Sequence, residues 1–247
     1  MNLQGKITLV TSAKGGLGTF VTEAFLAAGA KVVGVSRSIQ ADDFSHPEFT
    51  AMPAELSSGE AAGKLAGDVV ARFGRIDALV HVMGGFAGGK SVAETDDATF
   101  EKMLDLNYRA AFYIARSVLP QMRQQGSGRI LAVASRQGVE PAAMVGAYSA
   151  SKAAMVALIR TIALENKDRS ISANTVLPGT MDTPGNRAGD PHADGSQWVQ
   201  PSQVAALRGL PRRLSSQHTY TAKTGSSFRS PVWRIPGSGR RCWAGNC

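Results

Sequence analysis

The sequence predicts one α/β domain over residues 1–207, built on a doubly wound parallel sheet with helices on both faces. Short apolar, β-branched runs that are typical of buried strands recur near 7–11, 31–35, 76–82, 129–135 and 171–177. Helical patterns lie between them, near 19–28, 59–73, 99–124 and 146–165. Strands that alternate with helices favour a parallel sheet covered on both sides, and roughly 200 residues suffice for one core.

The first strand runs directly into a glycine-rich turn. Residues 6–11 read as a strand, Gly15-Gly16-Leu17-Gly18 follows, and a helical pattern then ends at Gly29. This strand, turn and helix form the context that the dinucleotide fingerprint requires. Glycines let the backbone approach a pyrophosphate, and the helix N-terminus offers free N–H groups. A glycine-rich turn that binds nothing is the alternative.

The end of the second strand bears on the choice of cofactor. An acidic residue about twenty positions after the glycine turn would hold the ribose 2′-hydroxyl of NAD. This chain has Ser36 and Arg37 there, and Lys14 lies in the turn. Because a guanidinium can bind a 2′-phosphate that a carboxylate would repel, we expect NADP(H) to be favoured over NAD(H). The alternative is that Arg37 is a solvated loop residue.

A candidate acid–base pair lies at the start of the last long helix. Tyr148 and Lys152 are four residues apart and so share one helix face, and Ser135 ends the preceding strand. An ammonium beside a phenol should lower the pKa of the phenol, which makes it a usable proton donor and acceptor. A half-buried Tyr beside a solvated Lys is the simpler interpretation of the pair taken alone.

Together, these motifs resemble the short-chain dehydrogenase/reductase family over roughly residues 3–207. Thr11–Gly18 is similar to the family's Thr-Gly-x-x-x-Gly-x-Gly turn, with Ser12 in place of the first glycine. His81–Gly84 corresponds to its Asn-Asn-Ala-Gly, with His81 and Met83 as departures. Pro178–Thr183 matches its Pro-Gly-x-x-x-Thr. The resemblance implies a Rossmann-type fold and NADP(H)-dependent interconversion of a carbonyl and an alcohol by hydride transfer.

The resemblance also implies a role for each catalytic residue. Ser135 would hold the carbonyl oxygen, Tyr148 would exchange its proton, and Lys152 would lower the phenol's pKa and bind the nicotinamide ribose. Asn107 would position a water that connects Lys152 to solvent, and Glu55 would lie at the adenine. The residues expected to bind the cofactor are Thr11, Ser12, Lys14, Gly16, Leu17, Gly18, Ser36, Arg37, Glu55, Leu56, His81, Met83, Gly84, Tyr148, Lys152, Pro178, Gly179 and Thr183.

The composition changes abruptly after residue 207. Residues 208–247 hold eight basic and no acidic residues, whereas 1–207 hold nineteen of each sign, so this segment carries the whole net charge of +8. The family would finish a helix here and add a last parallel strand, which we expect to be missing or altered. We expect a frame-shifted or disordered basic tail, since the bases allowed by residues 228–234 also permit Leu-Pro-Val-Ser-Gly-Leu-Ala in another frame.

A second function class follows from these departures. Ser12, His81 and the altered C-terminal segment would suit a nucleotide-binding protein with little or no catalysis. Binding of nucleic acid by the basic segment is a weaker alternative, because its charges are scattered rather than gathered on one face.

Expectations about partners and location follow from what the sequence lacks. Both cysteines, Cys242 and Cys247, lie after residue 207 without further Cys or His spaced for zinc, so we expect no metal site. The absence of a disulfide framework, a signal peptide or a membrane span favours a cytoplasmic protein. Family resemblance implies a small-molecule substrate and a homo-oligomer, either a tetramer or a dimer.

Overall fold

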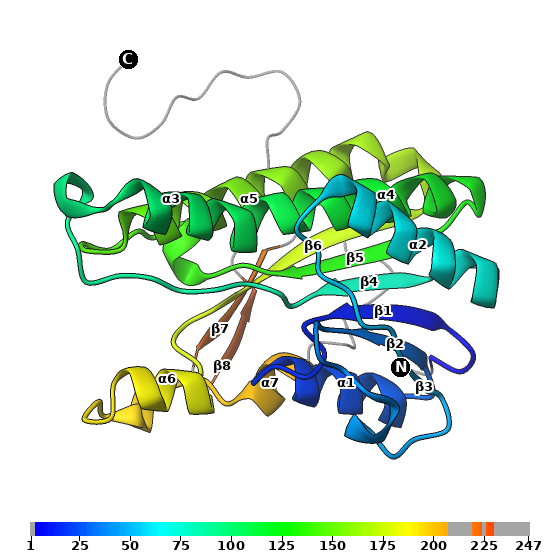
Figure 1. Cartoon of the computed structure of the whole chain (residues 1–247), viewed down its shortest axis with the longest axis horizontal. Helices are drawn as coiled ribbons and strands as arrows, with labels where there is room; N and C mark the ends of the chain where they lie inside the picture. Colours follow the sequence, from blue (N-terminus) through cyan, green and yellow to red (C-terminus); the bar gives the residue numbers. More distant parts are fainter. Residues whose placement is uncertain (1–2, 207–218, 224–225, 230–247) are drawn as a thin grey trace.

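The computed structural model describes residues 3–206, 219–223 and 226–229, and it confirms the doubly wound α/β fold (Figure 1). Within these residues the strands form one sheet in the order β3-β2-β1-β4-β5-β6-β7-β8. All neighbouring pairs are parallel except β7 and β8. The strands are β1 (Ile7–Thr11), β2 (Lys31–Val35), β3 (Phe49–Ala51), β4 (Ala78–His81), β5 (Gly128–Val133), β6 (Ile171–Pro178), β7 (Thr219–Lys223) and β8 (Ser226–Arg229).

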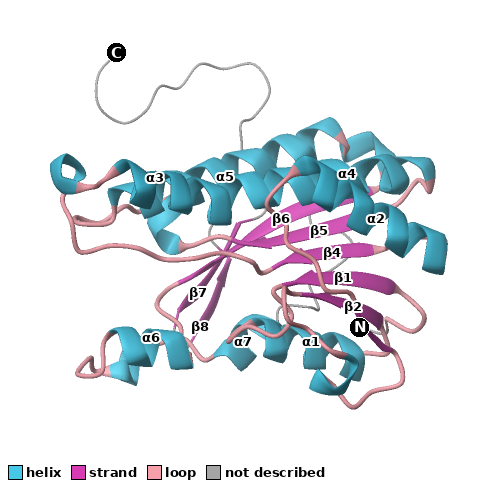
Figure 2. Cartoon of the chain, in the orientation of Figure 1, coloured by secondary structure: helices cyan, strands magenta, loops and turns pink. Residues whose placement is uncertain are grey.

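Helices cover both faces of the sheet (Figure 2). On one face lie α2 (Gly59–Phe73), α3 (Asp97–Leu104), α4 (Ala110–Gln124) and α5 (Gly146–Glu165), and on the other α1 (Gly18–Ala27), α6 (Pro184–Gly189) and α7 (Pro201–Ala205). Successive side chains of a strand point to opposite faces, so the central strands contribute to a hydrophobic core on each side of the sheet. Leu9 and Leu79 point into the core under α2, α4 and α5, and Val10 and Val80 point into the core under α1 and α7. No helix in the described part of the chain has the length and hydropathy needed to cross a bilayer.

One predicted helix is divided in the structure. The pattern over 99–124 predicts a single helix, but a π-helical turn, Asp105–Arg109, separates α3 from α4. Asp96 caps α3 by accepting a hydrogen bond from the backbone N–H of Thr99 at 2.7 Å. The extra residue of a π turn re-aims side chains within a helix, and here the turn contains the fully buried Asn107.

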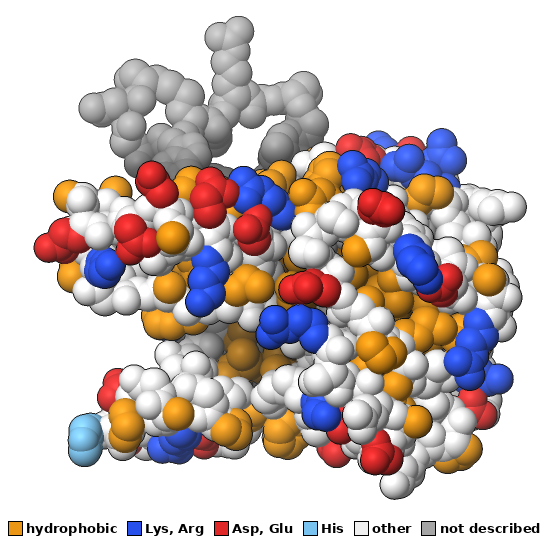
Figure 3. Space-filling view, viewed as in Figure 1, with side chains coloured by type: hydrophobic (Ala, Val, Ile, Leu, Met, Phe, Trp, Pro, Cys, Tyr) orange, Lys and Arg blue, Asp and Glu red, His pale blue; other side chains and the backbone are white. Residues whose placement is uncertain are grey.

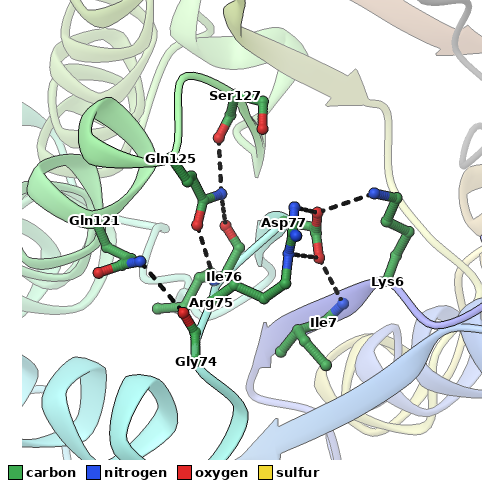
Figure 4. A network of polar contacts seen from close by, with 9 residues as sticks. All are labelled: Lys6, Ile7, Gly74, Arg75, Ile76, Asp77, Gln121, Gln125 and Ser127. Carbon is green, nitrogen blue, oxygen red and sulfur yellow. Dashed lines mark hydrogen bonds and ion pairs between the residues drawn. The ribbon is translucent and has the colours of Figure 1, made fainter.

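A carboxylate ties together the amino ends of β1 and β4 (Figure 4). Asp77 accepts hydrogen bonds from the backbone N–H of Ile7 at 3.0 Å, from Arg75 at 2.7 and 2.9 Å, and from Lys6 at 3.2 Å. Burial raises the pKa of this carboxyl, but the bonds from Arg75, Ile7 and Lys6 outweigh burial and leave the pKa below its ordinary value. The network fixes the register at the end of the sheet where these two strands begin.

Three strands, β3, β7 and β8, are not among those predicted from the sequence. The short strand β3 was missed because its three residues are only half-buried and stand among polar neighbours. We expected the last parallel strand to be missing or altered. It is not missing, because Thr219–Lys223 lies parallel to β6, and the antiparallel β8 follows it. The run Thr-Tyr-Thr is rich in residue types that favour extended backbone, a local signal that the overall basic composition obscured.

Candidate active site

The glycine turn is built so closely that a side chain cannot be added at its helix end. A methyl group at Gly18 would overlap the carbonyl oxygen of Ser12, which also accepts a hydrogen bond from the N–H of Gly15 at 2.9 Å. A methyl at Gly16 would lie 3.1 Å from Cβ of Thr183, so the turn meets the Pro178–Thr183 motif. This close backbone, with the N-terminus of α1 beside it, forms a cradle that fits a pyrophosphate.

Ser12 adopts an unfavourable backbone conformation in this turn. Its φ of +54° lies in the left-handed region that glycine adopts freely and serine does not. The serine therefore retains the turn of the family pattern at a cost of about 1 kcal/mol in backbone strain.

His81 lies at the carboxyl end of β4, paired in register with Thr11 of β1. The Thr11 hydroxyl oxygen accepts from the N–H groups of Val82 and Met83 at 3.1 and 3.2 Å, so its own proton goes to Nδ1 of His81, 3.1 Å away. The neutral ring then carries its proton on Nε2, which is buried and has no hydrogen-bond partner among the described residues. Burial, with a smaller contribution from the charge of Lys152, lowers the pKa of His81 to about 3.

Ser135, Tyr148 and Lys152 come together as expected at the ends of β5 and α5. The Tyr148 phenol is hydrogen-bonded to Ser135, whose oxygen also accepts from the N–H of Gln137 at 3.2 Å. Lys152 is almost completely buried; its Nζ lies 5.9 Å from the centroid of the Tyr148 ring and donates to the carbonyl of Val133 at 3.2 Å. A hydroxyl pair beside a buried amine can hold and protonate a carbonyl oxygen.

The pKa values of this pair differ from expectation. Lys152 was expected to lower the pKa of Tyr148, but burial of the phenol raises it and the hydrogen bond from Ser135 offsets only part of that rise. Burial also lowers the pKa of Lys152 to about 8, because the site sequesters the ammonium from water. At neutral pH, Tyr148 is therefore protonated and Lys152 is mostly charged.

Asn107 clamps the loop that follows β4. Its Oδ1 accepts from the N–H of Gly85 at 2.9 Å, and its Nδ2 donates to the Gly85 carbonyl at 3.0 Å and to Ser151 at 3.1 Å. A methyl group at Gly84 would lie 2.7 Å from Asn107 Oδ1 and 2.9 Å from Lys152 Nζ, so both groups face the same glycine. Ser151, which sequence analysis missed, donates in turn to the Tyr148 carbonyl at 2.8 Å. Its position three residues after Tyr148 was the sequence signal that could have identified Ser151 as a neighbour of the site.

Apolar side chains border Tyr148. The Phe86 ring stands edge-on to Tyr148 with centroids 5.0 Å apart and is 62% exposed, and Met144 is 46% exposed at a φ of +65°. Gly89 binds the Met144 carbonyl through its N–H at 2.8 Å, which joins the loop after β4 to the start of α5. Figure 3 shows a hollow with hydrophobic side chains between the α3–α5 layer and α6.

The remaining predicted cofactor residues are more dispersed. Lys14 and Ser36 are adjacent, since the Lys14 N–H donates to Ser36 Oγ at 3.4 Å, and Arg37 is exposed beside them. Leu56 is buried, whereas Glu55 is exposed after β3 and has no contact with another predicted site residue among the described interactions. The other members of the motifs occupy strand ends or turns, among them Leu17 before α1, Pro178 at the end of β6 and Gly179 after it.

Comparison with known proteins agrees with this geometry. Residues 6–193 match the family model described as short chain dehydrogenase. A 2-dehydro-3-deoxy-D-gluconate 5-dehydrogenase of Dickeya dadantii is 28% identical over 92% of both chains, so that alignment extends past residue 207. An uncharacterized oxidoreductase of Thermotoga maritima is 34% identical over 75% of each chain.

Solved structures give the same result. A short-chain dehydrogenase/reductase from Burkholderia xenovorans has a TM-score of 0.77 at 29% identity, covering 87% of this chain and 90% of its own. A 3-ketoacyl-(acyl-carrier-protein) reductase from Brucella melitensis, complexed with NADH, shares the fold with a TM-score of 0.80 at 22% identity, covering 91% and 99%. With its family motifs assembled at one sheet edge, this chain belongs to the short-chain dehydrogenase/reductase family of NAD(P)-dependent oxidoreductases.

Proposed function

We propose that the protein is an NADP(H)-dependent oxidoreductase that interconverts a carbonyl and an alcohol, with Tyr148 as acid and base. The observation that carries the proposal is the hydrogen bond between Ser135 and Tyr148 beside the buried amine of Lys152. A bound nicotinamide cofactor would supply or accept the hydride. The Gly16–Gly18 cradle and the N-terminus of α1 would hold its pyrophosphate, and Lys14, Ser36 and Arg37 a 2′-phosphate.

The protein's own residues then handle the substrate oxygen and its proton. Ser135 donates a hydrogen bond to the carbonyl oxygen, and Tyr148, protonated at neutral pH, transfers its proton to that oxygen as negative charge develops there. The charge of Lys152 stabilises the phenolate that remains. Asn107 fixes the loop at Gly84 and Gly85, and in this proposal it also holds a water through which Lys152 is reprotonated.

The orphaned Nε2–H of His81 gives a second reason to expect a ligand here. A buried donor without a partner costs about 1–3 kcal/mol, and a bound polar group or water would remove that cost. His81 occupies a motif position that the family resemblance assigns to the cofactor. The residues present therefore fit a nicotinamide dinucleotide.

The proposal is tested by titrating the purified protein with NADPH and with NADH and then following NADPH oxidation with a panel of aldehydes and ketones. Saturable NADPH binding that is tighter than NADH binding, together with turnover of at least one carbonyl, is the expected result. Failure to bind either cofactor would exclude the proposed function.

A second candidate is a nucleotide-binding protein with little or no catalysis. Two features favour it: the strained Ser12 in the cofactor turn and the replacement of the family's Asn by His81. Cofactor binding at micromolar concentration without turnover of any carbonyl or alcohol in the panel would favour this candidate over the first.

Assembly and the origin of residues 208–247 are separate proposals. We propose a cytoplasmic homo-oligomer, tetramer or dimer, on the basis of the family; light scattering of the purified protein measures its mass directly. The shifted-frame origin of residues 208–247 is supported by the abrupt loss of acidic residues. Sequencing the gene across its 3′ end tests it, and the lack of a helix and strand in either alternative frame would exclude it.

A further inference from the structure

The cation that should bind a 2′-phosphate is already paired within the protein. Nζ of Lys14 lies 2.8 Å from Oδ1 of Asp43 and 3.4 Å from the carbonyl of Ser38. Asp43 belongs to a short 3-10 turn, Ala41–Asp43, that follows β2. Its carboxylate was not singled out from the sequence, because its proximity to the glycine turn exists only in the folded chain.

The carboxylate of Asp43 is held in this orientation from its other side. Oδ2 accepts a hydrogen bond from the backbone N–H of Gln40 at 2.8 Å, and the Asp43 N–H donates to the Gln40 carbonyl at 3.3 Å. Its side chain is only 19% exposed, against 44% for Lys14. The hydrogen bonds from Lys14 and Gln40 lower the pKa of Asp43, so it is ionised at neutral pH.

The other cation in this region is not neutralised in this way. Arg37 is exposed and forms no ion pair or hydrogen bond with another described residue. A dianionic phosphate that approached Lys14 would meet a fixed carboxylate less than 3 Å from the same amine. Like charges at such separations repel, and Lys14 would have to exchange one anion for the other. Of the two cations, only Arg37 would then bind the phosphate without first giving up another anion.

We propose that Asp43 is a specificity-determining residue that competes with the 2′-phosphate of NADP(H) for Lys14 and so reduces the preference over NAD(H). The inference rests on the proposed function, since it assumes that the cofactor occupies the glycine cradle. Because Asp43 neutralises Lys14 while Arg37 stays unpaired, NADPH should still bind more tightly than NADH, but by a smaller margin.

The test compares the variants Asp43→Asn and Asp42→Asn. Asp42 is the adjacent acidic residue, exposed and without an ion pair among the described residues, so its replacement gives the same change in net charge without releasing Lys14. Dissociation constants for NADPH and NADH are measured by fluorescence, and those for 2′,5′-ADP and 5′-AMP by calorimetry. The nucleotides without nicotinamide isolate the contribution of the 2′-phosphate.

Asp43→Asn should bind NADPH and 2′,5′-ADP about three- to five-fold more tightly than the parent protein, as expected for release of a partly exposed ion pair. Its affinity for NADH and 5′-AMP should change less than two-fold, as should every affinity of Asp42→Asn. The gain should also shrink at high salt and vanish when Lys14→Met is added to Asp43→Asn.

Three results would overturn the inference: an equal gain for NADH, an equal gain in Asp42→Asn, or weaker NADPH binding by Asp43→Asn. The last would show that Asp43 positions Lys14 for the phosphate instead of competing with it. If the parent protein binds none of the four nucleotides, the proposed function itself fails, which is a distinguishable outcome.

Discussion

Replacing the buried Lys152 by methionine should make the protein more stable at neutral pH. Burial lowers the pKa of this lysine from 10.5 to about 8, which measures how strongly the folded state disfavours its ammonium. Below pH 8 Lys152 is protonated in both the folded and the unfolded states, so the folded state carries the whole free-energy penalty of a buried ammonium. Between pH 8 and 10.5 only the unfolded state retains it, and the penalty disappears as the pH rises.

The size of the effect follows from that difference in pKa. One pKa unit corresponds to about 1.36 kcal/mol, so the penalty is about 3 kcal/mol at pH 7 and about 1 kcal/mol at pH 9.5. Methionine cannot donate to the Val133 carbonyl, which lies 3.2 Å from Nζ, and this loss costs about 1 kcal/mol. Lys152→Met should therefore be about 2 kcal/mol more stable than the parent at pH 7, and nearly equal to it at pH 9.5.

Urea unfolding at pH 7 and pH 9.5, followed by circular dichroism, measures both differences. At pH 7 the melting temperature should also rise by about 4–8 °C. Lys102→Met is the control, because Lys102 is exposed on α3 and its replacement should change stability by less than about 0.5 kcal/mol at either pH. A Lys152→Met variant that is less stable than the parent at pH 7, or equally stabilised at both pH values, would refute the reasoning.

Three further outcomes are expected. Gly18→Ala should lower the free energy of unfolding by about 2–4 kcal/mol and weaken NADPH binding, because its methyl group would overlap the Ser12 carbonyl. Gly63→Ala, with open space around it in a helix, should instead stabilise the protein by about 0.5–1 kcal/mol. Denaturant unfolding and fluorescence titration test this, and identical behaviour of the two variants would contradict it. Asp77→Asn should lower the free energy of unfolding by about 1–2 kcal/mol at pH 7. Because folding lowers the pKa of Asp77, this difference from the parent should shrink as the pH falls below about 4. A difference in urea unfolding that does not depend on pH would count against the network. Phe86→Ala should raise KM for an aryl ketone about five-fold, because the exposed ring beside Tyr148 would pack against an aromatic substrate, while changing KM for a small aldehyde less than two-fold. Equal effects on both substrates in steady-state kinetics would show that Phe86 does not contact the substrate.

Much of the fold could be predicted from local patterns. The strand, glycine turn and helix at residues 7–27 are specified by apolar periodicity and by glycines, and the structure places them close to the expected bounds. Ser135, Tyr148 and Lys152 could be paired because four residues make one helical turn and because the preceding strand ends at the same sheet edge.

What escaped prediction depends on contacts between distant segments. The π turn around Asn107 is invisible to a helical periodicity, and the pairing of Lys14 with Asp43 is set by the path of the loop after β2. The pKa of Tyr148 was expected to fall because sequence shows a neighbouring charge but not the burial of the phenol, and burial dominates. Burial of a polar group is a property of packing, which spacing alone does not reveal.

The most direct measurement of the proposed chemistry is single-turnover reduction of a carbonyl substrate by the variant Tyr148→Phe at saturating NADPH. We expect a rate constant at least about 10³-fold below that of the parent, with the dissociation constant for NADPH unchanged within three-fold, because only the transferable proton is removed. A variant that reduces the substrate at a rate within ten-fold of the parent would contradict it.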